Sequence, residues 1–183
     1  IQESNVSVAQ LAAGELDLTI RVPPGEGPGL ASVPGLKQLN VPGVGIFSVN
    51  FNHNTTDKAF RQAIAYSINR QEIIDSVLGG LATLNYTIPP GFNTVPGLLD
   101  KINPYYYDPE KAKAALAESS WGDKKLRLAL LADDPNFTVT APALQQAIQD
   151  ALGIEVELTA LPSAPYNDLI QKTDDWDVFL SFG

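Results

Sequence analysis

The last third of the chain alternates strand-like and helix-like segments, and this pattern constrains the fold more than any other feature. Apolar residues alternate with polar or small ones over 126–130 and 154–158, and a third strand is predicted over 176–181. Apolar residues recur at helical spacing over 144–152, ended by Gly153, and a shorter helix is predicted around 166–171. Strand, helix, strand, helix and strand with short joints are typical of parallel strands joined by right-handed crossovers.

The first part of the chain predicts a less regular set of elements. A helix-like stretch over 8–12 is followed by alternating apolar residues over 16–20, which predict a strand. The Pro- and Gly-rich stretch 22–45 is predicted to be a surface loop, with one short strand near 36–41. A further strand is predicted over 46–52.

Three helices follow from their caps and apolar faces. The first has an apolar face made of Phe60, Ala63, Ile64 and Ile68. The second is capped by Asn69, with Glu72 three residues on, and ends at Gly79-Gly80. The third opens with Asp108-Pro109-Glu110, which are a cap, a first-turn proline and an acid near the positive end of the helix dipole. Its buried stripe is predicted to be Ala112, Ala115 and Leu116. We expect Tyr105-Tyr106-Tyr107 to pack their loop onto this helix rather than to form a ligand shelf. Together these elements predict one α/β domain.

Composition excludes several classes of function. The net charge is -9, and nucleic acids and anionic membranes need clustered Lys and Arg, so neither is an expected partner. The absence of cysteine excludes thiolate metal sites, thiol nucleophiles and disulfides. The chain has no methionine and stops directly after a predicted strand, so we expect both ends to be cuts through a longer polypeptide.

Catalytic motifs are nearly absent. His53 is the only histidine, and its polar turn indicates a solvated loop side chain. Gly43-Val44-Gly45 resembles the start of a dinucleotide fingerprint, but a strand and not a helix follows it, so no helix N-terminus can hold a pyrophosphate. We therefore predict no cofactor and no metal site.

Two acidic groups are candidate sites. Asp133-Asp134 and Asp174-Asp175 with Asp177 could in principle serve acid–base chemistry or calcium binding, but acids in turns more often cap helices or stay solvated. Asp133-Asp134 is the more informative pair. It follows a predicted parallel strand and precedes a helix, where open α/β sheets place their ligands.

An ordered series of segments resembles one family, the peptide, dipeptide and nickel solute-binding proteins of bacterial ABC importers. The strongest match is 60–70, Phe-Arg-Gln-Ala-Ile-Ala-Tyr-Ser-Ile-Asn-Arg. Weaker matches follow the family's order along nearly the whole chain. They are Ala13-Gly14-Glu15-Leu16-Asp17-Leu18, Ser48-Val49-Asn50-Phe51-Asn52, Gly79-Gly80-Leu81-Ala82-Thr83, Pro89-Pro90-Gly91, Tyr107-Asp108-Pro109-Glu110-Lys111-Ala112, Gly153-Ile154-Glu155-Val156 and Trp176-Asp177-Val178.

The resemblance implies a fold and a function. Residues 1–183 would form a single type II periplasmic-binding-protein-like lobe, excised from a larger two-lobe protein. Its sheet would be mixed, with a C-terminal parallel βαβαβ unit flanked by helices. Intact family members close two jaws on a peptide or other small solute outside the cytoplasm and deliver it to ABC permease subunits. A monomer without catalytic activity is expected.

By position in the family, the resemblance also implies ligand-facing residues. Arg21 and Glu26 would contribute after the first predicted strand. The turn after 126–130 would add Asp133, Asp134, Asn136 and Thr138, and the end of the chain would add Ser181 and Phe182. The turn acids fit a cationic or amine-bearing ligand, whereas Arg21 fits a carboxylate, so the ligand class stays open.

The residues also allow two other functions besides that of a binding lobe. The first is a hydrolase or transferase that uses Asp133 and Asp134. The second is a protein-interaction module whose contact surface is the loop 22–45.

Overall fold

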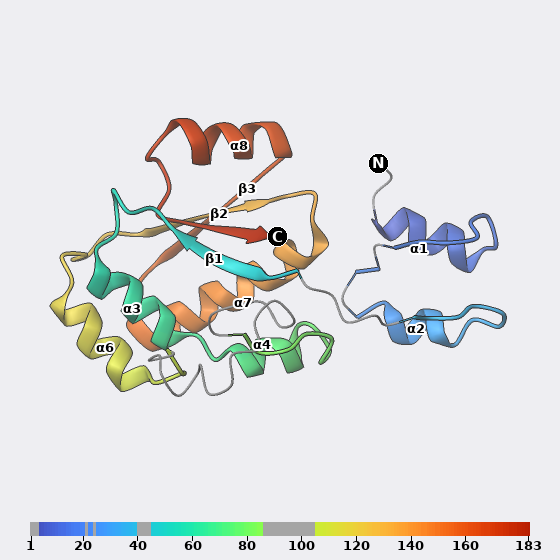
Figure 1. Ribbon diagram of the computed structural model, residues 1–183, viewed down its shortest axis with the longest axis horizontal. Helices are drawn as coiled ribbons and strands as arrows, with labels where there is room; N and C mark the ends of the chain where they lie inside the picture. Colours follow the sequence, from blue (N-terminus) through green and yellow to red (C-terminus); the bar gives the residue numbers. More distant parts are fainter. Residues whose placement is uncertain (1–3, 21, 24, 40–44, 86–104) are drawn as a thin grey trace, which may run out of the picture.

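The structure is a computed structural model that describes residues 4–20, 22–23, 25–39, 45–85 and 105–183. Two helices come first, α1 (Ser4–Ala12) and α2 (Gly27–Ala31). Figure 1 shows them on an N-terminal segment that stands apart from the sheet. The remaining elements form a four-stranded sheet and the helices around it. In chain order they are β1 (Phe47–Phe51), α3 (Lys58–Ser67), α4 (Arg70–Ser76), α6 (Pro109–Glu118), β2 (Leu126–Leu131), α7 (Pro135–Leu152), β3 (Val156–Leu161), α8 (Ser163–Lys172) and β4 (Val178–Phe182).

The sheet is mixed, as predicted. Its strand order is β1-β4-β2-β3, with β2 parallel to both β3 and β4, and β1 antiparallel to β4. The chain therefore crosses from β2 to β3 in one direction and returns past β2 to β4 in the other. Crossovers of the same hand that run in opposite directions must place their helices on opposite faces. Figure 1 shows this arrangement, with α7 on one face and α8 on the other.

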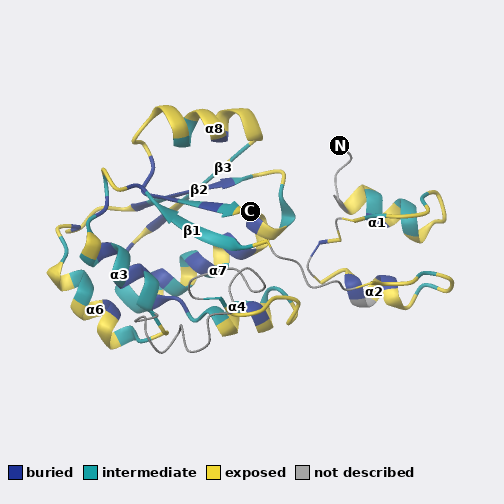
Figure 2. Ribbon diagram, viewed as in Figure 1, coloured by how far each residue is buried: buried dark blue, intermediate teal, exposed yellow. Residues whose placement is uncertain are grey.

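The core lies between the sheet and the helices on the α7 side. Figure 2 shows buried residues gathered where α3, α6 and α7 meet the strands. The predicted apolar face of α3 is confirmed, because Phe60, Ala63 and Ile64 are fully buried and Ile68 is 5% exposed. Phe60 stacks on Trp121 with ring centroids 3.8 Å apart, which fixes α3 against the turn before β2.

Local capping predictions also hold. The Asn69 side chain accepts the Glu72 backbone N–H, and the Asp108 side chain accepts that of Lys111. Gly153 ends α7 with φ 69°, a left-handed conformation that favours glycine. Tyr105 does not pack its loop onto α6 as predicted but anchors it to α3, where its hydroxyl accepts from Gln62 Nε2 at 3.1 Å. Tyr106 and Tyr107 are 52% and 47% exposed.

Two strand predictions are wrong. Residues 16–20 form no strand, and the side chains of Leu18 and Ile20 are 75% and 87% exposed. A strand needs a hydrogen-bonded neighbour, and the described part of the chain places none beside this segment, so its alternation alone is insufficient. The short strand near 36–41 is absent from 36–39, and its remaining positions lie outside the described residues.

Several element ends differ from the predictions, most of all that of α7, which begins at Pro135 and not near residue 144. The turn predicted after 126–130 is therefore short, and Asn136 already lies in the first turn of α7. Pro is well suited to the first helical turn, where its missing N–H needs no partner. The last strand covers Val178–Phe182 instead of 176–181.

Candidate ligand-binding edge of the sheet

One edge of the sheet collects an end of every strand. The parallel strands β2, β3 and β4 all finish there, and β1, which is antiparallel, begins there. The backbone N–H of Ala132 donates to Leu161 O at 2.9 Å, and that of Ile46 donates to Gly183 O at 2.6 Å. These bonds join β2 to β3 and β1 to β4 at this edge. Open α/β sheets bind ligands outside the carboxyl ends of their strands, so we call this the carboxyl edge.

Four of the predicted site residues lie together at the start of α7, just beyond β2. The Asp134 carboxylate accepts the backbone N–H of Asn136 at 2.9 Å and so caps the helix. Thr138 Oγ1 donates to Pro135 O at 3.2 Å. Asp133 and Asn136 are exposed. The acid pair is thus divided: Asp134 holds a helix end, whereas Asp133 faces solvent at the carboxyl edge.

Ser181 and Phe182 reach the same edge from β4. Ser181 Oγ lies 2.9 Å from Ser48 Oγ on β1 and accepts from Asn50 Nδ2 at 2.8 Å. Sequence reasoning missed Ser48 and Asn50, although both are polar residues at alternate positions of a predicted strand. Nothing local in the sequence indicates that β1 pairs with β4.

Phe182 is 64% exposed, and its ring lies over Gly45, the residue that precedes Ile46 and β1. A Cβ at position 45 would overlap the Phe182 ring. Glycine at this position therefore leaves room for the tip of the Phe182 ring beside the backbone at the carboxyl edge.

Only one of the other two predicted site residues is described, and it does not lie at this edge. Arg21 lies outside the described residues. Glu26 precedes α2, is exposed, and makes no capping hydrogen bond with its side chain. Figure 1 places α2 on the N-terminal segment, beside α1.

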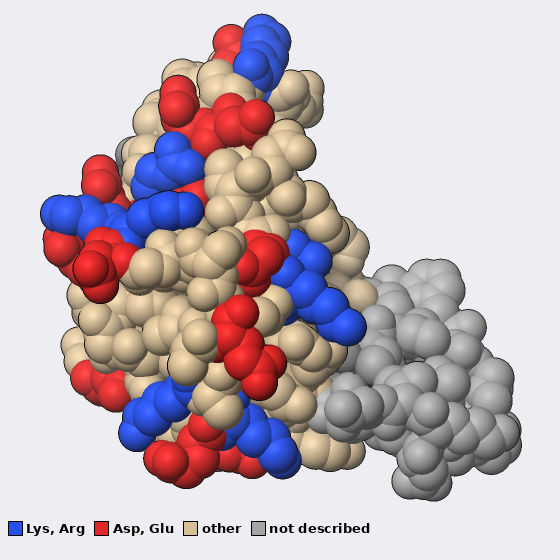
Figure 3. All heavy atoms as spheres, turned by 90° about the vertical axis from the view of Figure 1, so that its left-hand side faces the viewer, with Lys and Arg blue, Asp and Glu red and all other residues tan. Residues whose placement is uncertain are grey.

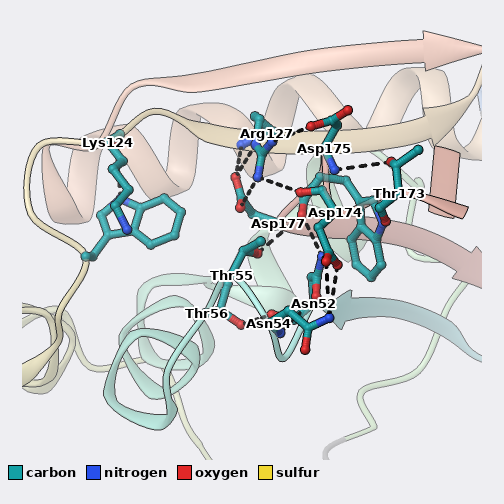
Figure 4. Close-up of polar contacts among 12 residues, drawn as sticks. Asn52, Asn54, Thr55, Thr56, Lys124, Arg127, Thr173, Asp174, Asp175 and Asp177 are labelled. Atoms are coloured by element: carbon teal, nitrogen blue, oxygen red, sulfur yellow. Dashed lines mark hydrogen bonds and ion pairs between the residues drawn. The ribbon is translucent and has the colours of Figure 1, made fainter. Parts of the chain in front are cut away.

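The second acidic group lies at the opposite edge, where β2 and β4 begin and β1 ends (Figure 4). Asp177 is 2% exposed and accepts from Arg127 Nε at 3.0 Å and from Nη2 at 2.8 Å. Asp174 accepts from Asn52 Nδ2 at 3.0 Å. This group joins three strands, which agrees with the structural role that the sequence favoured for it.

Electrostatics at this opposite edge follow from these contacts. Burial pushes the pKa of Asp177 upward, but hydrogen bonds from Arg127 outweigh it and leave the pKa below its usual value. Hydrogen bonds from Asn52 and then Asn54 lower the pKa of Asp174. Both carboxylates are held in their charged form, which suits structural ion pairing.

Other chemistry is weakly represented in the described part of the chain. No group of three or more His, Cys, Asp or Glu residues there could hold a metal ion. No described helix is both long and apolar enough to cross a membrane. On the face drawn in Figure 3, basic side chains lie among acidic ones. Lys111 Nζ, for example, lies 2.9 Å from Asp108 Oδ2.

Comparison with known proteins identifies the class that this fold and edge define. Residues 1–182 match the middle region of the bacterial extracellular solute-binding proteins, family 5. The chain therefore belongs to this family, and the resemblance seen in the sequence is confirmed.

Three similar proteins illustrate the match. An ABC transporter peptide-binding protein of Brucella ovis is 30% identical over 131 residues, 68% of this chain and 24% of that protein. The dipeptide-binding protein of Escherichia coli K12 is 38% identical over 92 residues, 49% of this chain and 16% of that protein. The oligopeptide-binding protein AppA of Bacillus subtilis, solved with a nonapeptide, is 21% identical with a TM-score of 0.83. That alignment covers 100% of this chain and 39% of AppA, so the type II binding-protein lobe is the shared fold. The chain spans about a quarter or less of the length of the two sequence relatives.

Proposed function

We propose that this chain is the ligand-binding lobe of a two-lobe extracytoplasmic solute-binding protein. It captures a peptide, or a similar small solute, at the carboxyl edge of its sheet. The intact protein then delivers the solute to the permease subunits of an ABC importer. The protein acts as a monomer and catalyses no reaction.

The observation that carries this proposal is the carboxyl edge itself. The end of β2, the end of β4 and the start of β1 present Asp133, Asn136, Ser181 and Phe182 on one side of the molecule. Polar groups of both hydrogen-bonding types beside an exposed aromatic suit a ligand with amide and apolar parts. A second lobe would supply enclosure, because hinge closure around the ligand buries most of its surface.

Binding fits the geometry better than the hydrolase or transferase hypothesis. Paired catalytic carboxylates must both be available to the reacting groups. The Asp134 carboxylate instead accepts a hydrogen bond from the backbone N–H of Asn136. The interaction-module hypothesis rests on the loop 22–45, of which residues 24 and 40–44 lie outside the described residues, and no contact of its described residues favours it.

The test is to purify the protein at its full natural length from its own host and to record native mass spectra. A co-purified peptide or other small solute is expected, and release of that solute on unfolding should leave a protein that binds it again in calorimetric titration. The 183-residue chain alone should bind the same solute at least about 100-fold more weakly, because the second lobe contributes enclosure. Turnover of a substrate panel that Asp133→Asn/Asp134→Asn abolishes would contradict the proposal.

A further inference from the structure

Three polar side chains form a compact hydrogen-bonded group across β1 and β4, which we call the triad: Ser48, Asn50 and Ser181. Asn50 Nδ2 donates to Ser181 Oγ at 2.8 Å and to Ser48 Oγ at 3.2 Å. The two serine hydroxyl oxygens lie 2.9 Å apart, and either can be the donor. The antiparallel register pairs Ser48 with Ser181 directly, so the backbone holds the triad together.

The triad cannot satisfy all of its own hydrogen-bonding groups. The Nδ2 group of Asn50 donates to the two serine hydroxyls and, at the longer distances of 3.4 and 3.5 Å, to the backbone carbonyls of Ser48 and Phe179, so its donors are engaged. One serine gives its proton to the other, and the proton of the second serine then has no acceptor within the group. The Asn50 carbonyl Oδ1 accepts nothing within the triad either. The triad therefore presents one spare O–H donor and one spare C=O acceptor.

The surroundings leave this pair of groups accessible. Residues 47, 49 and 51 of β1 face the core on the α7 side, so Ser48 and Asn50 face the other way. On that side α8 packs against β2 and β3, and all three triad residues remain partly exposed. Asn50 lies opposite Phe179, whose ring packs edge-on against Tyr166 and Trp176. The triad thus has an aromatic wall on one side and the carboxyl edge on the other.

We propose that the triad binds a main-chain amide of a peptide ligand. The spare serine hydroxyl donates to the amide C=O, and Asn50 Oδ1 accepts the amide N–H. None of the three side chains carries a charge, so an internal peptide bond fits better than a terminal carboxylate or ammonium group. This inference rests on the proposed function and adds to it the part of the ligand that β1 and β4 recognise.

The experiment uses the full-length protein, freed of co-purified solute by unfolding and refolding, with tetra-alanine as the probe. Three analogues each carry one ester in place of one amide, which removes a single N–H donor. Calorimetric titration should give wild-type protein a Kd about 10-fold higher for one of these esters than for tetra-alanine. Asn50→Ala should bind tetra-alanine about 10-fold more weakly and should lose nothing further on that ester, because the removed partner was the ester's contact.

Ser181→Ala provides a second variant in case Asn50→Ala fails to fold. It should bind tetra-alanine more weakly than wild type but should still bind the critical ester more weakly than tetra-alanine, because Asn50 is present. Ser76→Ala, on the exposed surface of α4, is the matched control and should bind as wild type does. Equal affinity of wild-type protein for tetra-alanine and all three esters overturns the inference and leaves the proposed function intact. The same holds if Asn50 and Ser181 variants bind as tightly as wild type. A co-purified solute without amide bonds, together with no binding of tetra-alanine, overturns the inference and leaves the proposed function intact. No co-purified solute and no binding of tetra-alanine or any other small solute overturns both.

Discussion

Arg127 binds Asp177 through both side chain and backbone, and this pair joins the start of β2 to the start of β4. Arg127 Nη2 lies 2.8 Å from Asp177 Oδ1, and the backbone N–H of Arg127 donates to Asp177 Oδ2 at 2.9 Å. In return, the backbone N–H of Asp177 donates to Arg127 O at 3.0 Å. The side chain of Asp177 is 3% exposed, so this pair is the best-shielded ion pair among the described residues.

Asp177→Ala should therefore destabilise the fold by about 3 kcal/mol, because the Nε and the backbone N–H of Arg127 both lose their acceptor. Asp175→Ala is the matched control: its carboxylate is 83% exposed and lies 3.8 Å from Arg127 Nη1. That variant should lose less than about 0.5 kcal/mol. Urea unfolding followed by circular dichroism measures both, and equal losses would contradict the role given to Asp177.

Asp57 should make stability depend on pH in the acid range. Hydrogen bonds from the Ser120 hydroxyl, then from the backbone N–H groups of Phe60 and Ser120, lower the pKa of Asp57 to about 2. A carboxyl whose pKa is depressed by folding stabilises the native state above its unfolded pKa of about 4, and loses that contribution as pH falls towards 2. At pH 7 the midpoint temperature of thermal unfolding should be higher for wild-type protein than for Asp57→Asn. This difference in midpoint should shrink between pH 4 and pH 2. A difference that stays constant over this range would show that Asp57 does not titrate as described.

Thr140 should be replaceable with a gain in stability. Its side chain is buried on α7, 2% exposed, and its Oγ1 has no hydrogen-bond partner. Thr140→Val keeps the shape and removes the cost of the buried hydroxyl, so we expect the free energy of unfolding to rise by about 1 kcal/mol. Thr138→Val, on the exposed side of the same helix, loses the bond to Pro135 O and should bring no gain. Thermal unfolding of the two variants side by side measures this, and a loss at Thr140 would refute it.

Gly45 should be coupled energetically to Phe182. Gly45→Ala places a methyl carbon where it overlaps the tip of the Phe182 ring, so the exposed ring must turn aside and the protein should lose about 1 kcal/mol or less. In Phe182→Ala the same methyl group meets open space, and Gly45→Ala should then cost little. Gly29→Ala, where nothing lies within 4 Å, serves as the control. Additive effects of the two changes in chemical denaturation would mean that the ring does not lie over Gly45.

Much of this fold could be predicted because its signals are local. The caps Asn69, Asp108 and Asp134 accept N–H groups two or three residues further along, and Gly153 ends α7 through its own φ angle. The order of strands and helices after residue 125 follows from hydrophobic spacing alone. Asp133 and Asn136 could be placed at a candidate site because the carboxyl end of a parallel strand has a known position in such sheets.

By itself, the sequence determined which segments become helices and strands after residue 45, and which family the chain resembles. Only the tertiary structure decided which strands are neighbours. Pairing depends on contacts between residues far apart in the chain, and no local sequence pattern encodes these contacts. For that reason the alternation over 16–20 predicted a strand that finds no partner in the described chain, whereas Ser48 and Asn50 passed unnoticed until β1 was seen beside β4. The triad exists because Ser48 and Ser181, 133 residues apart, share one antiparallel register.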